Sequence, residues 1–442
     1  MAQKVKTRVP RGMRDILPEQ MIRRQYVMDV IRTVFEEFGF ESLQTPAIEL
    51  SEILMGKYGP DAEKLIYQTS HQGGREELSL RYDLSVPLCR VVAMYPELPK
   101  PLKRYQISPV WRAERPQKGR YREFFQCDAD TVGSASMLAD AETLNVIYEI
   151  LLRLGFKQFV MNINNRKIIT GIGQFSGVPD DLLGGLYRSI DKLEKIGLDG
   201  VRKELADNNI PEDAINRLLN LLSIEGQNRD VLATLRDQLS DYPIALEGID
   251  ELEEIIGYME SLDISDEYYS VKFAMVRGLD YYTGPIYETV VETPQIGSIT
   301  GGGRFDDLVG MFTNHSQPAV GTSIGIERII DVMEELDMFP PSVGKTSAQV
   351  LMTVFDESLA SESLKIANML RQGGLNTALY FGTARLGNQI GYAGTKAIPY
   401  VVILGPDELE ADEVTIRNLP LRTQQTVRRA EAVELIKGWM AD

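Results

Sequence analysis

The sequence of 442 residues has little cysteine and little histidine. Its two cysteines, Cys89 and Cys127, exclude a framework of several disulfide bonds and a zinc site of four thiolates. Its two histidines, His71 and His315, are too few for a catalytic histidine network or a histidine-rich metal site. The sequence also lacks any run of 18 or more apolar residues. It therefore predicts no membrane-spanning helix, and we expect a cytoplasmic protein.

Net positive charge is lacking as well, because 64 acidic residues outnumber 47 basic ones and give a formal charge of −17. Such a chain does not coat nucleic acids non-specifically. The negative charge is concentrated over residues 166–266, where 21 acidic and 10 basic residues occur in a segment with helical periodicity. A solvated helical surface is the simpler interpretation of that segment.

The length of the chain predicts two or three domains. Residues 1–165 combine helical periodicity with short alternating runs, which predict an antiparallel sheet. Residues 166–266 are predicted to be helical, and strand patterns return over 267–337. The stretch 338–347 (MFPPSVGKTS) predicts a linker, and 348–442 alternates strands and helices as a small α/β domain.

The most basic window runs from Lys103 to Arg122 and carries seven basic residues against one acidic residue, Glu114. Two predicted strands joined by RPQKGR form a hairpin with a cationic tip, followed by Phe124 and Phe125. Guanidinium groups suit phosphate oxygens, because two N–H groups address one phosphate in fixed geometry. A phosphate-binding hairpin is one interpretation, and a solvated basic loop with both phenylalanines in the core is the other.

Two further windows contain polar groups or glycines in predicted strands. MVRGLDYYTGPIYE (275–288) places Arg277 near two tyrosines, and a buried ion pair and a ligand contact are equally consistent with its composition. GSITGGGRFDDLVG (297–310) and GTSIGIERII (321–330) match neither a Walker A loop nor a dinucleotide-binding fingerprint. Arg328 falls in the first turn of a predicted helix, where the helix dipole disfavours a cation, so we expect an anionic partner such as phosphate.

Together these windows resemble the three signature motifs of class II aminoacyl-tRNA synthetases and, more closely, the histidyl-tRNA synthetase family. GFESLQTPAIEL (39–50), with Pro46 at the motif 1 proline, is similar to motif 1. WRAERPQKGRYREFFQ (111–126) resembles motif 2 and GTSIGIERI (321–329) resembles motif 3. RGLDYYTG (277–284) is similar to a peptide specific to histidyl enzymes, and RGMRDILP and IPYVVILGPDELEADEVTIRNL extend the resemblance over nearly the whole chain.

The resemblance implies an α+β fold of the class II synthetase type. It implies an antiparallel six-stranded catalytic domain with a helical insertion at 166–266, a C-terminal α/β anticodon-binding domain, and a homodimer built around motif 1. The implied reaction joins L-histidine to ATP as histidyl-adenylate, releases pyrophosphate, and then transfers the histidyl group to histidine tRNA. Mg²⁺ would arrive with ATP rather than occupy a dedicated protein site.

The resemblance assigns the phosphates of ATP to arginines. Arg112 and Arg277 are the implied catalytic residues, both on the α-phosphate, where preplaced cations stabilise the charge that develops during attack. Arg328 would hold the far end of ATP. Arg120 and Arg122 are further candidates for the outer phosphates.

The same resemblance places Glu114 at the adenine or beside it and stacks Phe124 on the ring. Three residues at the hairpin tip are candidates for contact with the tRNA acceptor end: Arg115, Gln117 and Lys118. For the anticodon, no reader is assigned; the region that fits contains Arg385, Asn388 and Gln389.

The histidine site is implied by RYDLS, in the variant of the family's substrate-binding strand that carries Asp83. Asp83 and Gln126 would bind the α-ammonium group, and Asp130 and Tyr282 would bracket the imidazole. Analogues that lack a ring nitrogen leave a buried polar group unpaired, so no editing domain is needed. The histidine-binding candidates are Asp83, Ser85, Gln126, Asp130, Tyr281 and Tyr282.

Two other functions are weighed against this one. A histidyl-like regulatory subunit of ATP phosphoribosyltransferase usually lacks both the C-terminal domain and the arginine of RGLDYY, whereas this chain has Arg277 and the residues after 338–347. A non-enzymatic RNA-binding or sensor protein would keep the basic hairpin without a complete adenylation set.

Overall fold

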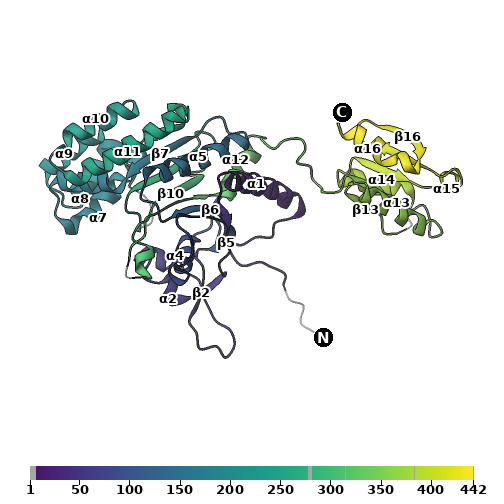
Figure 1. Cartoon of the computed structure of the whole chain (residues 1–442), viewed down its shortest axis with the longest axis horizontal. Coiled ribbons are helices and arrows are strands. Elements are labelled where there is room, and N and C mark those ends of the chain that lie inside the picture. Colours follow the sequence, from purple (N-terminus) through teal and green to yellow (C-terminus); the bar gives the residue numbers. More distant parts are fainter. Residues whose placement is uncertain (1–5, 277–280, 314, 383, 442) are drawn as a thin grey trace. The chain divides into compact units, whose positions relative to one another are not determined.

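The chain forms two compact units in a computed structural model that describes residues 6–276, 281–313, 315–382 and 384–441 (Figure 1). One unit comprises Met1–Asp15 and Val27–Met338, and the other comprises Ile16–Tyr26 and Phe339–Asp442. Helix α1 (Pro18–Glu37) contributes its start to the second unit and the rest to the first. No helix in these described ranges is long and apolar enough to cross a bilayer.

The first unit is built on an eight-stranded sheet with the order β1-β5-β6-β11-β10-β9-β7-β8. Its six central strands pair antiparallel, which confirms the expected antiparallel sheet, and short strands β1 and β8 add parallel edges. The strands are β1 (Glu41–Ser42), β5 (Leu102–Trp111), β6 (Glu123–Val132), β7 (Val160–Asn165), β8 (Tyr269–Val271), β9 (Pro285–Val290), β10 (Thr300–Arg304) and β11 (Ala319–Ile324).

The two faces of this sheet differ because side chains alternate along each strand. Helices α5 (Met137–Arg153) and α11 (Pro243–Ser261) cover one face, where apolar residues such as Ile147 and Ile256 are buried. The other face carries polar side chains of β5 and β6, paired in register as Arg104 with Asp130 and as Ser108 with Gln126. That polar face is where a ligand can be bound.

Six helices occupy the segment that the resemblance implies to be an insertion, and Figure 1 shows them clustered at the end of the sheet that carries β7. Gly171 permits close packing of the first helix on α11, because a Cβ there would lie 2.4 Å from the Ala245 Cβ. The helices that precede α11 are α6 (Arg166–Ser176), α7 (Asp180–Ile190), α8 (Leu193–Asp207), α9 (Glu212–Leu222) and α10 (Asn228–Gln238).

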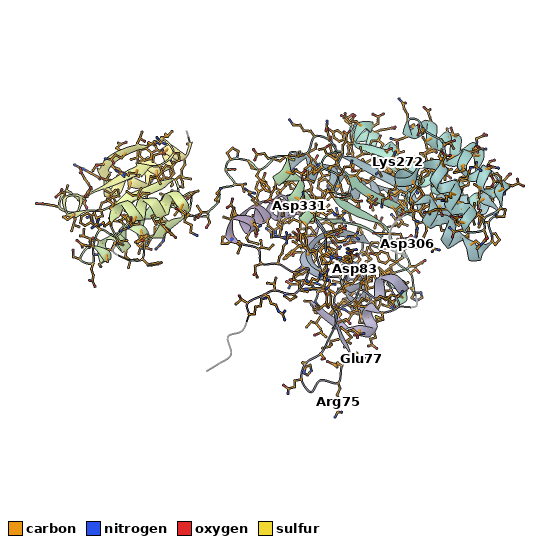
Figure 2. All side chains as sticks on the ribbon, turned by 180° about the vertical axis from the view of Figure 1, so that it is seen from behind. Arg75, Glu77, Asp83, Lys272, Asp306 and Asp331 are labelled. Atoms are coloured by element: carbon orange, nitrogen blue, oxygen red, sulfur yellow. The ribbon has the colours of Figure 1, made fainter. Side chains whose placement is uncertain are left out.

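Smaller elements complete the first unit. A three-stranded sheet has the order β2-β4-β3, and in Figure 2 the labelled Arg75 and Glu77 lie on its protruding β3–β4 connection, whereas Asp83 lies inside the unit. These elements are β2 (Ile48–Leu50), α2 (Ser51–Leu54), α3 (Pro60–Glu63), β3 (Gln68–Thr69), β4 (Leu78–Leu80), α4 (Ser85–Met94) and α12 (Ile326–Glu335).

The second unit has a five-stranded sheet with the order β13-β12-β14-β15-β16, in which β12 pairs in parallel with both neighbours. Its core packs Met352, Ile366 and Val402 between the sheet and the helices. The elements are β12 (Val350–Met352), α13 (Ala360–Gln372), β13 (Thr377–Leu379), α14 (Leu386–Thr395), β14 (Tyr400–Ile403), α15 (Pro406–Ala411), β15 (Glu413–Asn418), β16 (Thr423–Arg428) and α16 (Ala432–Ala441).

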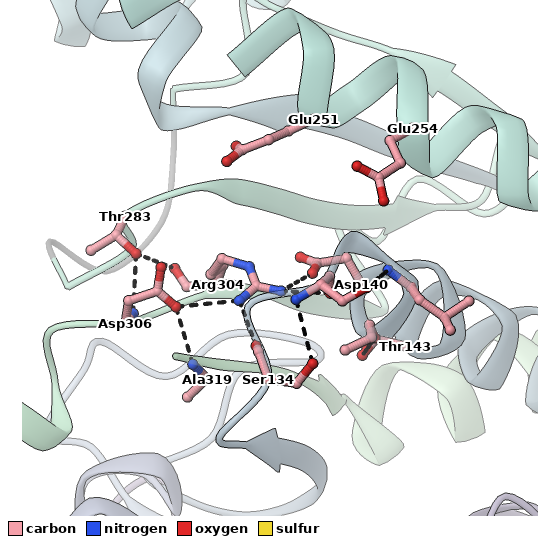
Figure 3. Close-up of polar contacts among 12 residues, drawn as sticks. Ser134, Asp140, Thr143, Glu251, Glu254, Thr283, Arg304, Asp306 and Ala319 are labelled. Carbon is pink, nitrogen blue, oxygen red and sulfur yellow. Dashed lines mark hydrogen bonds and ion pairs between the residues drawn. The ribbon is translucent and has the colours of Figure 1, made fainter. Parts of the chain in front are cut away.

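A buried ion pair ties the glycine-rich strand β10 to helix α5 on the covered face of the sheet (Figure 3). Arg304 pairs with Asp140, and these side chains are 3% and 0% exposed. Arg304 also donates to the Ser134 carbonyl at 2.9 Å, while its own carbonyl accepts from the Thr283 N–H at 2.8 Å. The pair therefore holds the segment that follows the two tyrosines 281 and 282.

We expect Arg304→Met to destabilise the protein by about 3–5 kcal/mol, because the variant leaves the Asp140 carboxylate buried without its counter-ion. Urea denaturation followed by circular dichroism measures the free energy of unfolding. The control is Arg229→Ala, which breaks the exposed pair with Glu260 and should cost less than about 1 kcal/mol. Equal effects of the two substitutions would show that the buried pair is not important for stability.

Candidate active site

A cavity of about 430 Å³ opens above the polar face of the large sheet. Its walls come from β6, β9, β10 and β11, from the segment before α4, and from the start of α12. Eleven residues predicted from the sequence line this one cavity, although they come from five separate stretches of the chain. They are Asp83, Ser85, Arg112, Glu114, Arg120, Phe124, Gln126, Asp130, Tyr281, Tyr282 and Arg328.

Strand β6 supplies the floor of the cavity, because its alternate residues Phe124, Gln126, Asp128 and Asp130 share one face. The neighbouring strand β11 must come close to this row. A Cβ at Gly321 would lie 2.0 Å from Asp130 Oδ1, so only glycine fits opposite that carboxyl group. This contact explains one glycine of the GTSIGIERI segment.

Arg112 lies over aromatic rings at one end of the cavity, which we call the cationic end and define by Arg112, Arg120 and Arg328. Its guanidinium carbon is 4.4 Å from the Tyr82 ring centroid and 5.2 Å from that of Phe124, and Nε donates to the Tyr82 carbonyl at 3.1 Å. Within the described residues Arg112 forms no ion pair with a carboxylate. Its charge therefore remains available to an anion.

Arg328 is half-buried at the start of α12, in the first turn as the sequence predicts. Its Nε donates to the Gly119 carbonyl at 3.3 Å and Nη1 donates to the Ser298 carbonyl, and no described carboxylate pairs with it. Burial, followed by repulsion from Arg120, lowers the pKa of Arg328. An anion between these two arginines would relieve both effects.

The remaining residues of the hairpin differ in their exposure to the cavity. Glu114 forms an ion pair with Arg120 at 3.1 Å, so these two cavity residues are already joined. Arg122 does not line the cavity, because it donates to the Glu114 carbonyl at 2.9 Å instead. The exposed tip of the hairpin does not line the cavity, and its residues are Arg115, Gln117 and Lys118. At this tip Lys118 forms an ion pair with Glu335 at 2.8 Å.

At the other end of the cavity, which we call the acidic end, lie the side chains of Asp83, Asp128 and Asp130. Asp83 Oδ1 accepts from Tyr58 Oη at 2.8 Å and from the Val86 N–H at 3.1 Å. Burial raises the pKa of Asp83, while these two hydrogen bonds oppose that shift. The carboxyl group is therefore buried and held in place at the start of α4.

Two tyrosines close the acidic end. The Tyr281 hydroxyl donates to Asp83 Oδ2 at 3.5 Å, and the rings of Tyr281 and Tyr282 meet edge to face at 5.0 Å. Burial raises the pKa of Tyr281, and a hydrogen bond with Ser85, which also lines the cavity, opposes that shift. Burial and the nearby carboxyl groups raise the pKa of Tyr282, so its hydroxyl stays protonated and can donate a hydrogen bond.

Among the described residues, Arg104 is a buried cation at the floor of the acidic end. Arg104 Nη2 lies 2.8 Å from Asp130 Oδ2, an ion pair without hydrogen-bond alignment, and donates to the Leu84 carbonyl at 2.9 Å. Burial, opposed by Arg104, raises the pKa of Asp130 to about 6. Within the described part of the chain, the three carboxyl groups of this end outnumber the guanidinium groups of Arg104 and Arg112 that oppose their burial, and a positively charged ligand group would complete the balance.

The sequence interpretation missed Asp128, Ser323 and Arg104. Asp128 is 2% exposed, and burial together with the charge of Asp130 raises its pKa to about 7. Period-2 alternation along QCDAD would have found it, because a strand that points Gln126 and Asp130 into a cavity must also point the residue between them there. No comparable sequence signal identifies Ser323 on β11 or Arg104 on β5.

The RGMRD segment near the N-terminus is held at the back of the cavity. Arg14 pairs with Glu327 of α12 and lies 3.7 Å from the Tyr121 ring centroid. Glu327 Oε1 also accepts from the Phe125 N–H at 3.4 Å, which joins the basic hairpin to α12.

Arg277, predicted to be catalytic, lies outside the described residues. In the part of the chain that is described, no group of three or more histidine, cysteine, aspartate or glutamate side chains could hold a metal ion.

In the second unit, the residues considered for the anticodon differ in exposure. Gln389 is fully buried, and its amide bonds the Val354 N–H, the Val354 carbonyl and the Ala384 carbonyl, so it cannot face a base. Arg385, the residue before α14, and Asn388 in α14 are exposed. Sequence reasoning overlooked Phe381, which follows β13 with 90% of its surface exposed.

Known proteins share both the sequence and this architecture. The family described as histidyl-tRNA synthetase matches residues 12–329, and the family described as anticodon binding domain matches residues 347–439. A histidine–tRNA ligase of Clostridium tetani is 40% identical over 98% of this chain and 99% of its own length. One of Aeropyrum pernix is 42% identical over 97% of this chain and 98% of its own.

A solved structure agrees with the sequence relatives. The crystal structure of histidyl-tRNA synthetase from Nostoc sp. PCC 7120 has a TM-score of 0.87 at 33% identity, and the match covers 98% of this chain and 99% of that one. The agreement extends over both units of the chain. The chain belongs to the histidyl-tRNA synthetase family.

Proposed function

We infer that this chain is an enzyme that ligates L-histidine to histidine tRNA in the cytoplasm, in two steps through a histidyl-adenylate formed from ATP. One observation carries the proposal: a single cavity joins an acidic end to a cationic end where two half-buried arginines, Arg112 and Arg328, have no carboxylate partner among the described residues. A substrate with a positive group at one end and phosphates at the other fits that arrangement.

In the first step, an oxygen of the histidine carboxylate attacks the α-phosphorus of ATP, the new P–O bond forms, and the bond to pyrophosphate breaks. Negative charge grows on the equatorial oxygens of the α-phosphate, and cations already in place stabilise it. Arg112 supplies one cation, held in place by two aromatic rings and the Tyr82 carbonyl. We assign the second cation to Arg277 because of its place in RGLDYYTG.

The rest of the nucleotide extends along the cationic end. Phe124 stacks on adenine, Glu114 lies beside it, and Arg328 and Arg120 hold the outer phosphates. When bound with ATP, Mg²⁺ supplies further neutralisation of phosphate charge. Oxygen-rich phosphates and water suit Mg²⁺, so these residues fit an ion carried by the nucleotide.

Histidine occupies the acidic end. Asp83 and Gln126 accept hydrogen bonds from its α-ammonium group, with Ser85 in support through Tyr281. Asp130 and Tyr282 bracket the imidazole as acceptor and donor. An analogue without a ring nitrogen leaves one of these buried groups unpaired, which costs far more than a missing methylene group.

In the second step, the ribose hydroxyl of the tRNA end attacks the carbonyl carbon of the adenylate, and AMP leaves. We assign the acceptor end to the exposed tip of the basic hairpin, whose residues are Arg115, Gln117 and Lys118. We assign the anticodon to the face that carries Phe381, Arg385 and Asn388, because exposed aromatic rings stack on unpaired bases.

Charging of histidine tRNA with labelled histidine tests the function, and failure to charge it would refute the proposal.

We expect Arg112→Ala to lower histidine-dependent ATP–pyrophosphate exchange by about 100- to 1,000-fold in kcat, because one cation is lost from the transition state. Arg202→Ala, which removes an exposed arginine of the helical insertion, is the matched control and should leave the exchange unchanged. An Arg112 variant with unchanged kcat would remove this residue from the adenylation step.

We expect Phe381→Ala to raise the KM for histidine tRNA about 5- to 100-fold, because one stacked base loses its platform, with pyrophosphate exchange unchanged. Leu421→Ala, at another exposed apolar side chain of the same unit, is the control and should leave both steps unchanged. If Phe381→Ala behaves like the control, the anticodon does not stack on this residue.

The motif 1 region supports the homodimer. Strand β2 lies at the edge of its sheet and exposes Ile48 and Leu50, which are 46% and 38% exposed. Exposed apolar residues on an edge strand are typical of an interface. We expect the double variant Ile48→Glu, Leu50→Glu to shift the mass in analytical ultracentrifugation from dimer to monomer. A wild-type protein that sediments as a monomer, or a variant that remains dimeric, would contradict this interface.

A further inference from the structure

The buried polar atoms of β6 that lack a hydrogen-bond partner within the described ranges include two acceptor oxygens, Gln126 Oε1 and Asp128 Oδ1, besides Asp130 Oδ2, which lies beside Arg104. Both side chains line the cavity, and they lie two residues apart on the same face of the strand. Buried acceptors of this kind are expensive to leave unpaired, so their presence at a cavity indicates a ligand with donor groups.

Ser323 of β11 forms hydrogen bonds with both Gln126 and Asp128. Ser323 lies opposite Asp128 in the β6–β11 register and forms a hydrogen bond with it. The same hydroxyl oxygen accepts from Gln126 Nε2 at 2.8 Å. The three side chains therefore form a chain of hydrogen bonds along the floor of the acidic end.

The direction of this chain follows from the number of protons. A serine hydroxyl has one proton, and an amide nitrogen can only donate. Ser323 must therefore donate to Asp128 and accept from the Gln126 amide nitrogen. The amide is then fixed with its nitrogen toward Ser323 and its oxygen, Oε1, free for a ligand. Without the carboxylate, Ser323 could donate to Gln126 instead and the amide could turn over.

We propose that Asp128 is a positioning residue for the amino-acid substrate, which acts through Ser323 to hold Gln126 Oε1 toward the α-ammonium group. This inference rests on the proposed function and deepens it. An ammonium group offers three N–H donors and one positive charge. It suits an end of the cavity where the three carboxyl groups of Asp83, Asp128 and Asp130 outnumber the described guanidinium groups that act on them, those of Arg104 and Arg112.

The test is histidine-dependent ATP–pyrophosphate exchange by the full chain carrying Asp128→Asn, Ser323→Ala, or both. Each single substitution should raise the KM for histidine about 10- to 100-fold, with the KM for ATP within about two-fold of the wild type. The double variant should be no worse than either single one, because both break the same chain of hydrogen bonds. Additive effects, or equal losses for histidine and ATP, would overturn the proposal.

A matched control separates this role from general damage to the sheet. Thr289→Val removes a buried hydroxyl on the covered face, where Thr300 Oγ1 donates to it at 2.6 Å. It should leave both KM values unchanged. Thermal melting identifies any variant that fails to fold, and if Asp128→Asn is one, Ser323→Ala, which removes only a hydroxyl group, decides the question.

Two inhibitors isolate the ammonium group. Histidinol keeps the ammonium group of histidine, whereas imidazolepropionate lacks it. Asp128→Asn should weaken inhibition by histidinol about 10- to 100-fold and leave inhibition by imidazolepropionate unchanged. Equal weakening of both, or no change in either, would overturn the positioning role. Absence of histidine-dependent exchange in the wild-type protein would instead refute the proposed function itself.

Discussion

Buried carboxyl groups on one face of an antiparallel strand are the constraint on which the site depends. Strand β6 points Asp128 and Asp130 to the same side because side chains alternate, and the segment before α4 adds Asp83. Among the described residues, Arg104 is a buried cation beside Asp130, Arg112 also lowers the pKa of Asp83, and burial raises the pKa of all three carboxyl groups. Several carboxyl groups buried close together are unfavourable when ionised, and this arrangement favours a ligand with a positively charged group.

The opposite end of the same cavity, the cationic end, carries positive charge. Arg112 and Arg328 are half-buried and bonded to backbone carbonyl oxygens, which orient their guanidinium groups without neutralising them. Gly321 of β11 leaves room for the Asp130 carboxyl group at the acidic end, and Arg304 holds β10 from behind through Asp140. In the proposed function, one sheet therefore sets the distance between the amino acid and the α-phosphate, which is what a reaction between two bound substrates requires.

The sequence predicted the antiparallel sheet from period-2 alternation, and it predicted eleven of the cavity residues from short motifs such as those around Arg112, Gln126 and Arg328. The sequence did not predict contacts between segments that lie far apart along the chain. The partner of Arg304 lies 164 residues away, and no local pattern connects them. Gln389 shows that the sequence can also suggest a contact that the fold prevents. It lies in a region that fits the anticodon, but its side chain is fully buried and its amide donates to the Val354 carbonyl just after β12. Asp128 was within reach of the alternation rule, but the motif resemblance drew attention only to its neighbours.

In the proposed function, one cavity holds both substrates of adenylate formation end to end. Displacement by a stable histidyl-adenylate analogue, the phosphate ester of histidinol with adenosine, tests it most directly. Labelled histidine and labelled ATP are bound separately to the wild-type protein, and the analogue is titrated against each. The account predicts that the analogue displaces both ligands with the same inhibition constant. Displacement of only one of them, or two widely different constants, would contradict a shared cavity.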